Sequence, residues 1–328
     1  MIGCSSFTLK TLNGTQLLSR TMDFATYVDS GVVVVPKGFK LNYNQNEQQV
    51  VQHRFLGMAN LTTSSPAFYD GVNEHGLAGA TLYYPGFATY QKQSTKTSIN
   101  PLQFISYMLG QAKNIEEVEM ILPSIDLINE INDILPIVPP LHFIFTDKSG
   151  KTLIIEPDQN QLTLHKDSIG VMTNSPNYQW HETNLRNYIG INPNQLKSVE
   201  LNGKTFKPFG QGSGTVGMPG DYTPPARFVR VAYLKEYAKK ATTELEGVTT
   251  SFHILASVDI PKGIVLNEQG NSDYTVYTSS MSTDSSNYYF ASYDNRRINK
   301  VNLFNEDLTD GKLKKYPLPM EQDIHHLN

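Results

Sequence analysis

The chain begins with Met1-Ile2-Gly3-Cys4-Ser5-Ser6, and Cys4 is its only cysteine. If the three preceding residues are removed, Cys4 becomes N-terminal and carries both a thiol and a free α-amine. An α-amine has a pKa of about 7.7–8.0 and can accept the proton of a neighbouring thiol near neutral pH. The stretch therefore predicts a nucleophile that needs no separate histidine base. The alternative is a chance cysteine on a first strand, buried as a small apolar residue.

The composition argues against a nucleic-acid-binding, a secreted or a membrane protein. The 328 residues include 27 Lys and Arg against 31 Asp and Glu, so the net charge of −4 gives no basis for a nucleic-acid partner. A single cysteine forms no internal disulfide, and its thiol must stay reduced to react, which favours the cytoplasm. The first residues lack the charge and apolar run of a secretory signal. Apolar runs such as 32–35 and 153–155 are far shorter than the ~20 residues of a membrane span, so no membrane partner is expected.

The hydrophobic pattern alternates between strands and pairs of helices, without a linker-like tract that would divide the chain. This order predicts one domain in which sheets are covered by helices, and it argues against a doubly wound parallel sheet. Strands are expected at residues 6–10, 31–36, 76–84, 141–146, 152–156, 161–165, 274–281 and 288–293. Helices are expected from Pro101, from an Asn114 cap to Pro123, from Tyr178 to Tyr188, from a Thr223 cap to Tyr237, and over residues 248–258.

Two charged residues follow the first strand in Ser19-Arg20-Thr21-Met22-Asp23-Phe24. If Cys4 and Arg20 lie on adjacent antiparallel strands, a turn near Asn13-Gly14 brings them together. An arginine beside the thiol favours the thiolate, and a carboxylate such as Asp23 beside the α-amine can orient it by hydrogen bonding. The alternative for Arg20 and Asp23 is an ordinary surface ion pair.

Three later features also qualify as parts of a site. The Asn174 amide in Thr173-Asn174-Ser175-Pro176 could donate to a developing oxyanion, although Asn before Ser-Pro is also ordinary turn chemistry. The glycine-rich segment 209–221 lacks the Lys-Ser/Thr ending of a phosphate loop and is predicted to line a site instead. Arg227 follows it, and its guanidinium points either into that site or toward a surface carboxylate.

Other chemistries find no support in the sequence. The eight histidines are scattered, and His325-His326 is expected to be a solvated tail, so we predict no metal site and no cofactor. The Gly-x-Ser-x-Gly elbow of serine hydrolases is absent.

Taken in order, these motifs resemble the penicillin V acylase and conjugated bile acid (choloylglycine) hydrolase family, a branch of the N-terminal nucleophile (Ntn) hydrolases. The resemblance implies an α+β fold, a four-layered αββα sandwich of two antiparallel sheets between helical layers. It also implies removal of residues 1–3 as a propeptide, a single domain over residues 4–328, and assembly as a homotetramer. The motifs that carry it are Gly3-Cys4-Ser5-Ser6, Arg20-Thr21-Met22-Asp23-Phe24, Tyr69-Asp70-Gly71-Val72-Asn73-Glu74, Met172-Thr173-Asn174-Ser175-Pro176, Pro219-Gly220-Asp221-Tyr222-Thr223 and Arg227-Phe228.

The resemblance also implies a role for each site residue. Cys4 is the nucleophile, Arg20 and Arg227 polarise and position it, and Asp23 holds the α-amine. The Asn174 amide and the backbone N–H of Tyr83 form the oxyanion hole. The reaction implied is amide hydrolysis through a thioester.

The substrate expectation rests on Tyr83 in Thr81-Leu82-Tyr83-Tyr84. Many bile salt hydrolases carry asparagine at this position, and an aromatic residue suits the aryloxyacetyl group of phenoxymethylpenicillin (penicillin V). Penicillin V is therefore the expected substrate, with glycine- or taurine-conjugated bile acids and N-acyl homoserine lactones as alternatives. A different class also stays open, namely a family member that is never processed and has no catalytic activity.

Overall fold

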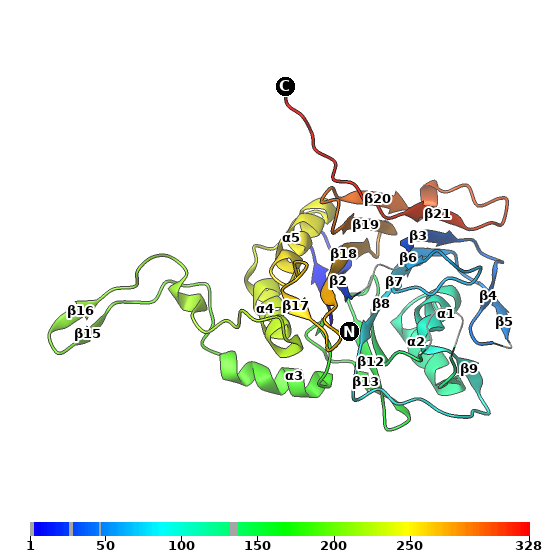
Figure 1. Cartoon of the computed structure of the whole chain (residues 1–328), viewed down its shortest axis with the longest axis horizontal. Helices are drawn as coiled ribbons and strands as arrows, with labels where there is room; N and C mark the ends of the chain where they lie inside the picture. Colours follow the sequence, from blue (N-terminus) through cyan, green and yellow to red (C-terminus); the bar gives the residue numbers. More distant parts are fainter. Residues whose placement is uncertain (1–2, 26–28, 46, 132–136) are drawn as a thin grey trace.

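Two large antiparallel sheets form the centre of the computed structural model, which describes residues 3–25, 29–45, 47–131 and 137–328 (Figure 1). The first sheet has the strand order β14 (Val171–Met172), β1 (Cys4–Lys10), β2 (Gln16–Phe24), β18 (Ser272–Ser282), β19 (Asn287–Ser292) and β20 (Asn299–Asn302), with β17 (Val265–Leu266) also paired to β18. The second has the order β13 (Gln161–His165), β12 (Thr152–Asp158), β11 (Leu141–Thr146), β8 (Ala78–Tyr83), β7 (Asp70–Asn73), β6 (Phe55–Asn60), β3 (Ser30–Val35) and β21 (Lys314–Pro317).

Helices cover the outer face of each sheet. The helices α4 (Pro224–Tyr237) and α5 (Glu244–Ala256) pack on the first sheet, and α1 (Phe104–Gln111) and α2 (Ile115–Ile121) pack on the second. The inner faces of the two sheets pack against each other through contacts such as those of β1 and β2 with β8. The predicted four-layered αββα sandwich is therefore confirmed.

Smaller elements complete the structure. The helix α3 (Tyr178–Asn184) continues into a 3-10 turn over Leu185–Tyr188, as predicted. Two short pairs, β4 (Lys40–Asn42) with β5 (Gln48–Val50) and β9 (Thr97–Ile99) with β10 (Ile125–Leu127), lie on the side of α1 and α2 (Figure 1). None of the described helices is long and apolar enough to cross a membrane.

The hairpin of β1 and β2 connects the layers. Its register places Cys4 opposite Met22 and Ser6 opposite Arg20, so these four side chains share one face of the sheet. Thr8 lies on the same face and its hydroxyl meets that of Thr152 in the second sheet at 3.5 Å. The predicted adjacency of Cys4 and Arg20 is thus confirmed, and both side chains lie between the sheets.

One helix start and one helix cap differ from the expectation. The helix α5 begins at Glu244 with Thr243 as its N-cap, whereas the sequence pattern placed its start at Val248. The apolar pattern marks only the packed face, and the first turn of α5 is largely polar and exposed. Thr223 is the N-cap residue of α4 as predicted, but its side chain makes no capping hydrogen bond. Its hydroxyl donates to the Asp221 carboxylate, and Pro224 and Pro225 at the start of the helix have no N–H to donate to it.

A two-stranded arm projects from the body between α3 and α4 (Figure 1). It contains β15 (Val199–Leu201) and β16 (Lys204–Phe206), which pair only with each other. The glycine-rich residues 209–217 belong to this arm, and most of them are exposed. The prediction that segment 209–221 lines a site is therefore wrong for residues 209–217, which lie in the arm. Residues 218–221 lead from the arm to Tyr222, whose carbonyl accepts a hydrogen bond from Arg227.

Candidate active site

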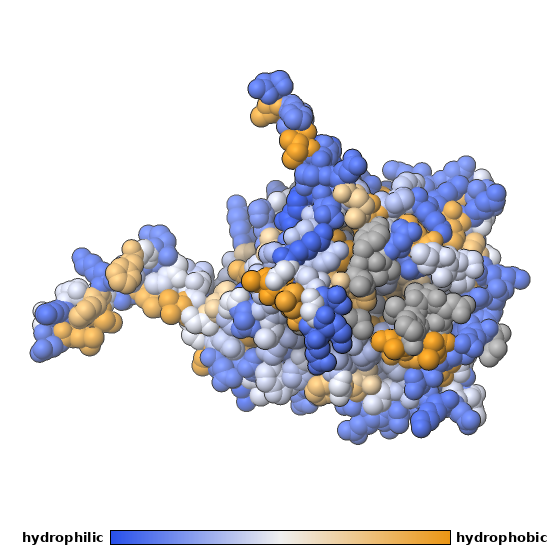
Figure 2. Space-filling model, viewed as in Figure 1, coloured by the Kyte–Doolittle hydropathy of each residue, from blue (hydrophilic) through white to orange (hydrophobic). Residues whose placement is uncertain are grey.

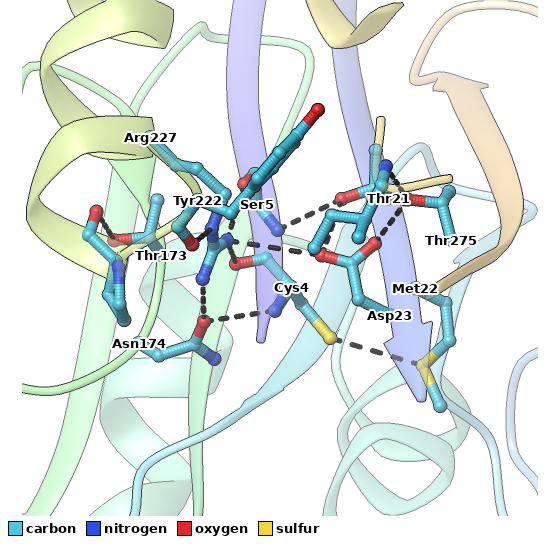
Figure 3. A network of polar contacts seen from close by, with 12 residues as sticks. Cys4, Ser5, Thr21, Met22, Asp23, Thr173, Asn174, Tyr222, Arg227 and Thr275 are labelled. Atoms are coloured by element: carbon cyan, nitrogen blue, oxygen red, sulfur yellow. Dashed lines mark hydrogen bonds and ion pairs between the residues drawn. The ribbon is translucent and has the colours of Figure 1, made fainter. Parts of the chain in front are cut away.

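Cys4 is the first residue of β1 and only 4% of its surface is exposed. Its Sγ lies 4.0 Å from Met22 Sδ, on the face that looks toward the second sheet (Figure 3). Burial raises the pKa of the thiol, while the positive charges of Arg20 and Arg227 work in the opposite direction. With Gly3 still attached, the thiol is therefore held in its neutral form, which is a poor nucleophile.

Arg20 places a fully buried positive charge near Cys4, on the face of the first sheet that looks toward the second sheet. Its Nη1 lies 3.3 Å from Asp70 Oδ2 and donates to the Tyr69 carbonyl at 3.2 Å. The Tyr277 hydroxyl donates to the same Asp70 carboxylate at 2.6 Å, and Tyr288 donates to its other oxygen. Because a buried charge is stable only when paired and hydrogen-bonded, Asp70 and its tyrosines hold Arg20 in place.

Arg227 brings a second fully buried guanidinium from α4, on the helix side of β1 (Figure 3). Its Nη1 donates to the Cys4 carbonyl and to Ser5 Oγ, both at 2.7 Å, and its Nη2 donates to Asn174 Oδ1 at 2.6 Å. The Nε donates to the Tyr222 carbonyl at 2.9 Å. Arg227 thus points into the site, and the alternative of a surface partner is excluded.

Asp23 lies near the end of β2 and is 3% exposed. Its carboxylate accepts a hydrogen bond from Thr275 Oγ1 at 2.6 Å and lies 3.9 Å from Arg227 Nη1. A bulge in β18 between Thr275 and Tyr277 shifts the register next to Asp23, and bulges commonly re-aim a side chain beside an active site. Burial raises the Asp23 pKa to about 7, although Arg227 and Thr275 oppose this shift.

Asn174 connects Cys4 to Tyr83. Its Oδ1 accepts a hydrogen bond from the Cys4 backbone N–H at 3.0 Å, and its Nδ2 donates to the Tyr83 carbonyl at 2.7 Å. On β8 the Thr81 N–H donates to the Tyr69 carbonyl. In a strand, the N–H and C=O groups of every second residue point toward the same neighbour. The Tyr83 N–H therefore points to the same edge of β8 as the Thr81 N–H and the Tyr83 carbonyl, which is the edge that Asn174 contacts.

Two histidines that the sequence did not single out fix the backbone around Asn174. His142 Nε2 contacts the Thr173 carbonyl at 2.9 Å, and His181 Nε2 contacts the Asn174 carbonyl at 2.8 Å. A carbonyl only accepts, so both ring nitrogens carry the proton. His142 also contacts the buried Glu156 at 3.3 Å. These contacts orient the Asn174 side chain without touching Cys4.

Gly3 lies directly against the two groups that surround the Cys4 backbone. Its φ is +68°, a left-handed conformation that favours glycine. A Cβ at this position would lie 2.2 Å from Arg227 Nη2 and 2.6 Å from Asn174 Oδ1. Any larger residue before Cys4 would therefore displace the guanidinium or the amide.

The structure thus brings together all the site residues that the sequence nominated. Arg20 and Asp23 are buried on opposite sides of the first sheet, so the alternative of a surface ion pair between them is wrong. Besides His142 and His181, three participants were missed. Met22 and Asp70 lie inside motifs that were noted for other residues, whereas Thr275 is 252 positions from Asp23 and no local pattern marks it.

Comparison with known proteins agrees with this geometry. The model of the choloylglycine hydrolase family of linear amide C–N hydrolases matches residues 4–316. A bile salt hydrolase/transferase from Clostridium perfringens is 32% identical over 99% of this chain and 100% of its own length. A conjugated bile acid hydrolase from Lactobacillus acidophilus is 32% identical over 95% of this chain and 100% of its own length. The crystal structure of a mutant conjugated bile acid hydrolase from C. perfringens covers 99% of this chain and 100% of that one, with a TM-score of 0.92.

The comparisons overturn penicillin V as the expected substrate. A penicillin V acylase from Pectobacterium atrosepticum is only 23% identical, over 88% of this chain and 77% of its own length. The expectation rested on the aromatic side chain of Tyr83. The role implied for this position, however, belongs to its backbone N–H, which any residue but proline supplies. One side chain therefore carries less weight than similarity along the whole chain.

In the uncleaved chain, the Asp23 carboxyl should make the free energy of unfolding fall as pH rises. The ordinary pKa of an aspartate carboxyl is 3.8, and that of Asp23 in the folded chain is about 7, so the folded state binds the extra proton between these values. Its contribution is complete below the lower value and is lost as pH rises through the higher one. We expect Asp23→Asn to remove this loss, which is on the order of a few kcal/mol between pH 4 and 8.

Urea unfolding at several pH values measures this effect, with Cys4→Ala as the parent so that the chain stays uncleaved. The exposed Asp284→Asn is the matched control and should follow the parent at every pH. Parallel curves for the parent and the Asp23→Asn variant would show that Asp23 is ionised throughout, against the prediction.

Proposed function

Because the chain belongs to the choloylglycine hydrolase family of linear amide C–N hydrolases, we propose that it hydrolyses the amide bond of glycine- or taurine-conjugated bile acids. The observation that carries the proposal is the similarity to bile salt hydrolases along the entire chain. The geometry around Cys4 supports it, because an arginine flanks the cysteine on each side and an asparagine contacts its nitrogen.

Activation begins when residues 1–3 are removed. The new α-amine of Cys4 then accepts the thiol proton, and the two buried guanidiniums stabilise the thiolate. The nearby Asp23 carboxylate accepts a hydrogen bond from the α-amine and orients it. Before cleavage the Cys4 nitrogen is an amide that donates to Asn174 Oδ1 and has no basic lone pair, so the uncleaved chain has no base at this position.

Acylation follows when Cys4 Sγ attacks the carbonyl carbon of the substrate amide. The carbonyl oxygen becomes an oxyanion that accepts hydrogen bonds from the Asn174 amide and the Tyr83 N–H. Loss of one such donor in comparable sites lowers the rate by about 10²–10³. The C–N bond then breaks, the α-ammonium gives its proton to the leaving glycine or taurine nitrogen, and a thioester remains.

Deacylation uses the same groups, with a water molecule as the nucleophile. The α-amine accepts a proton from a water molecule, whose oxygen attacks the thioester carbonyl. The oxyanion forms again at Asn174 and Tyr83, and the C–S bond breaks. The free bile acid leaves, and the thiolate and the α-ammonium are restored to the state that precedes the next attack.

The substrate proposal predicts that the processed protein hydrolyses glycocholate and taurocholate with a higher kcat/KM than penicillin V. Release of glycine, taurine and 6-aminopenicillanic acid is measured side by side, and N-acyl homoserine lactones are included as a third class. Cys4→Ser should lower every rate at least 10³-fold. A higher kcat/KM for penicillin V or for a lactone, or no hydrolysis of either conjugate by processed protein, would overturn the proposal.

Processing is itself proposed to depend on Gly3. Gly3→Ala should slow removal of residues 1–3 at least tenfold, because the new Cβ collides with Arg227 and Asn174. Gly14→Ala is the matched control, since Gly14 has a similar positive φ of +95° but no heavy atom within 4 Å of its Cβ position. Intact mass during expression gives the processed fraction. Equal processing of the Gly3→Ala and Gly14→Ala variants would contradict the prediction, and wild-type protein that never loses residues 1–3 would favour the non-catalytic class.

We also propose that the enzyme works in the cytoplasm, because the Cys4 thiol must stay reduced to react. We further propose that it assembles as a homotetramer through the projecting arm. Figure 2 shows apolar surface along this arm, which extends away from the body. Such exposure is uncommon on a monomer and is typical of an interaction surface. The exposed apolar residues of the arm include Leu196, Val199, Leu201, Phe206, Phe209 and Val216.

The arm proposal predicts that the double variant Val199→Asp, Phe206→Asp dissociates the tetramer. These residues face each other across the β15–β16 pair and each is about half exposed, so two carboxylates there would oppose burial in an interface. Light scattering coupled to size exclusion measures the mass. Asn202→Asp, at the hairpin tip, is the control and should stay tetrameric. A monomeric wild-type protein at micromolar concentration would refute the proposal.

A further inference from the structure

Three side chains with metal-binding chemistry meet far from Cys4. His53 lies in the connection from β5 to β6, while Glu74 and His75 lie in the turn from β7 to β8. His53 Nδ1 and His75 Nε2 are 3.1 Å apart, and one carboxylate oxygen of Glu74 completes a set whose ligand atoms all lie within 4.8 Å of one another. The sequence did not reveal this cluster, because pairing of β6 with β7 brings Glu74 and His75 to His53 from 21 and 22 positions away.

The backbone that carries these ligands is held firmly. The His53 N–H donates to the Gly110 carbonyl at 3.1 Å, and the His75 N–H donates to Asn73 Oδ1 at 3.0 Å. Asn73 is fully buried, and its Nδ2 donates to the Leu109 and Ala112 carbonyls. The cluster is therefore preorganised and does not depend on a loop closing around an ion.

The spacing of the two imidazoles suits a shared metal ion. Tetrahedral Zn²⁺ binds histidine nitrogens at about 2.0–2.1 Å, which places two such nitrogens about 3.3 Å apart. The two nitrogens are 3.1 Å apart, and the rings lie nearly perpendicular with their centroids 4.5 Å apart. The rings must therefore separate slightly and turn so that both nitrogens aim at one ion. Without a metal ion, the same contact is a hydrogen bond in which one ring nitrogen donates and the other accepts.

Glu74 supplies the negative charge that such an ion needs. Its two oxygens accept hydrogen bonds from the Arg54 N–H at 3.2 Å and from Arg54 Nε at 3.0 Å. A carboxylate offers about four lone-pair sites, so a metal ion can bind while Arg54 remains in contact. The side chains are only partly buried, which leaves solvent access for a water molecule as fourth ligand.

We propose that His53, Glu74 and His75 form a binding site for one divalent transition-metal ion with the ligand preferences of Zn²⁺. The site links the β5–β6 connection to the β7–β8 turn, at the opposite end of β8 from Tyr83. Its role is structural, since no ligand touches the groups around Cys4. It replaces the expectation of a chain without a metal site.

Isothermal titration of the full chain with ZnCl₂ tests the proposal. We expect one site of about unit stoichiometry, with Kd increased at least tenfold by His53→Gln and by His75→Gln. His253→Gln, in α5, is the matched control and should bind like the wild type. Co²⁺ should give visible absorption bands of a four-coordinate ion in the wild type and the control, and these bands should be lost in both site variants.

A measurement on the unmodified chain guards against variants that fail to fold. Zn²⁺ should slow the reaction of diethyl pyrocarbonate with His53 and His75, read by peptide mass spectrometry, and should leave His253 unaffected. Wild-type affinity in both site variants, binding that disappears only when His325 and His326 are replaced, or absence of protection at His53 and His75 would each overturn the proposal. Because the readouts are binding and protection, they are independent of hydrolytic activity.

Discussion

The contact of Arg227 with the start of β1 is the interaction on which the site depends. One fully buried guanidinium donates to the Cys4 carbonyl, to Ser5 Oγ and to Asn174 Oδ1. These bonds join three parts of the chain: helix α4, which carries Arg227, strand β1, and the segment after β14. Burying a charge is unfavourable unless it is paired and hydrogen-bonded, so the three parts must assemble together for Arg227 to be satisfied.

A second buried guanidinium, Arg20, lies on the other side of β1 and is paired with Asp70 from the second sheet. Cys4 is therefore held between two positive charges that come from opposite faces of the same strand. In the uncleaved chain this field does not offset burial, and the thiol pKa stays raised. The proposed removal of Gly3 would change this balance, because it would leave a basic nitrogen on Cys4 and free the space that Gly3 occupies beside Arg227 and Asn174.

The two ends of β8 illustrate how one sheet serves two tasks. At its C-terminal end, the Tyr83 backbone faces Asn174 and the reacting groups. At its N-terminal end, the turn that carries Glu74 and His75 meets His53. The rigid strand keeps these ends apart, so a metal ion bound at the turn can stabilise the second sheet without entering the chemistry.

Local signals in the sequence determined most of the secondary structure and the candidate site residues of this protein. Alternating apolar residues marked most strands, Asn114 marked the start of α2, and the motifs around Cys4, Arg20, Asn174 and Arg227 nominated the site. All of these signals are local, because hydrophobic periodicity and helix capping depend on residues only a few positions apart.

Only the tertiary structure decided which distant groups meet. Thr275 reaches Asp23, and His53 reaches His75, through strand pairing over separations that leave no local trace. Of the glycine-rich segment 209–221, which we predicted to line a site, residues 209–217 lie in the arm. The residues of this segment do not by themselves determine how far from Cys4 the segment lies. The reason is physical: contacts between strands depend on sheet order and register, and these are settled by packing of the whole core and not by any one segment.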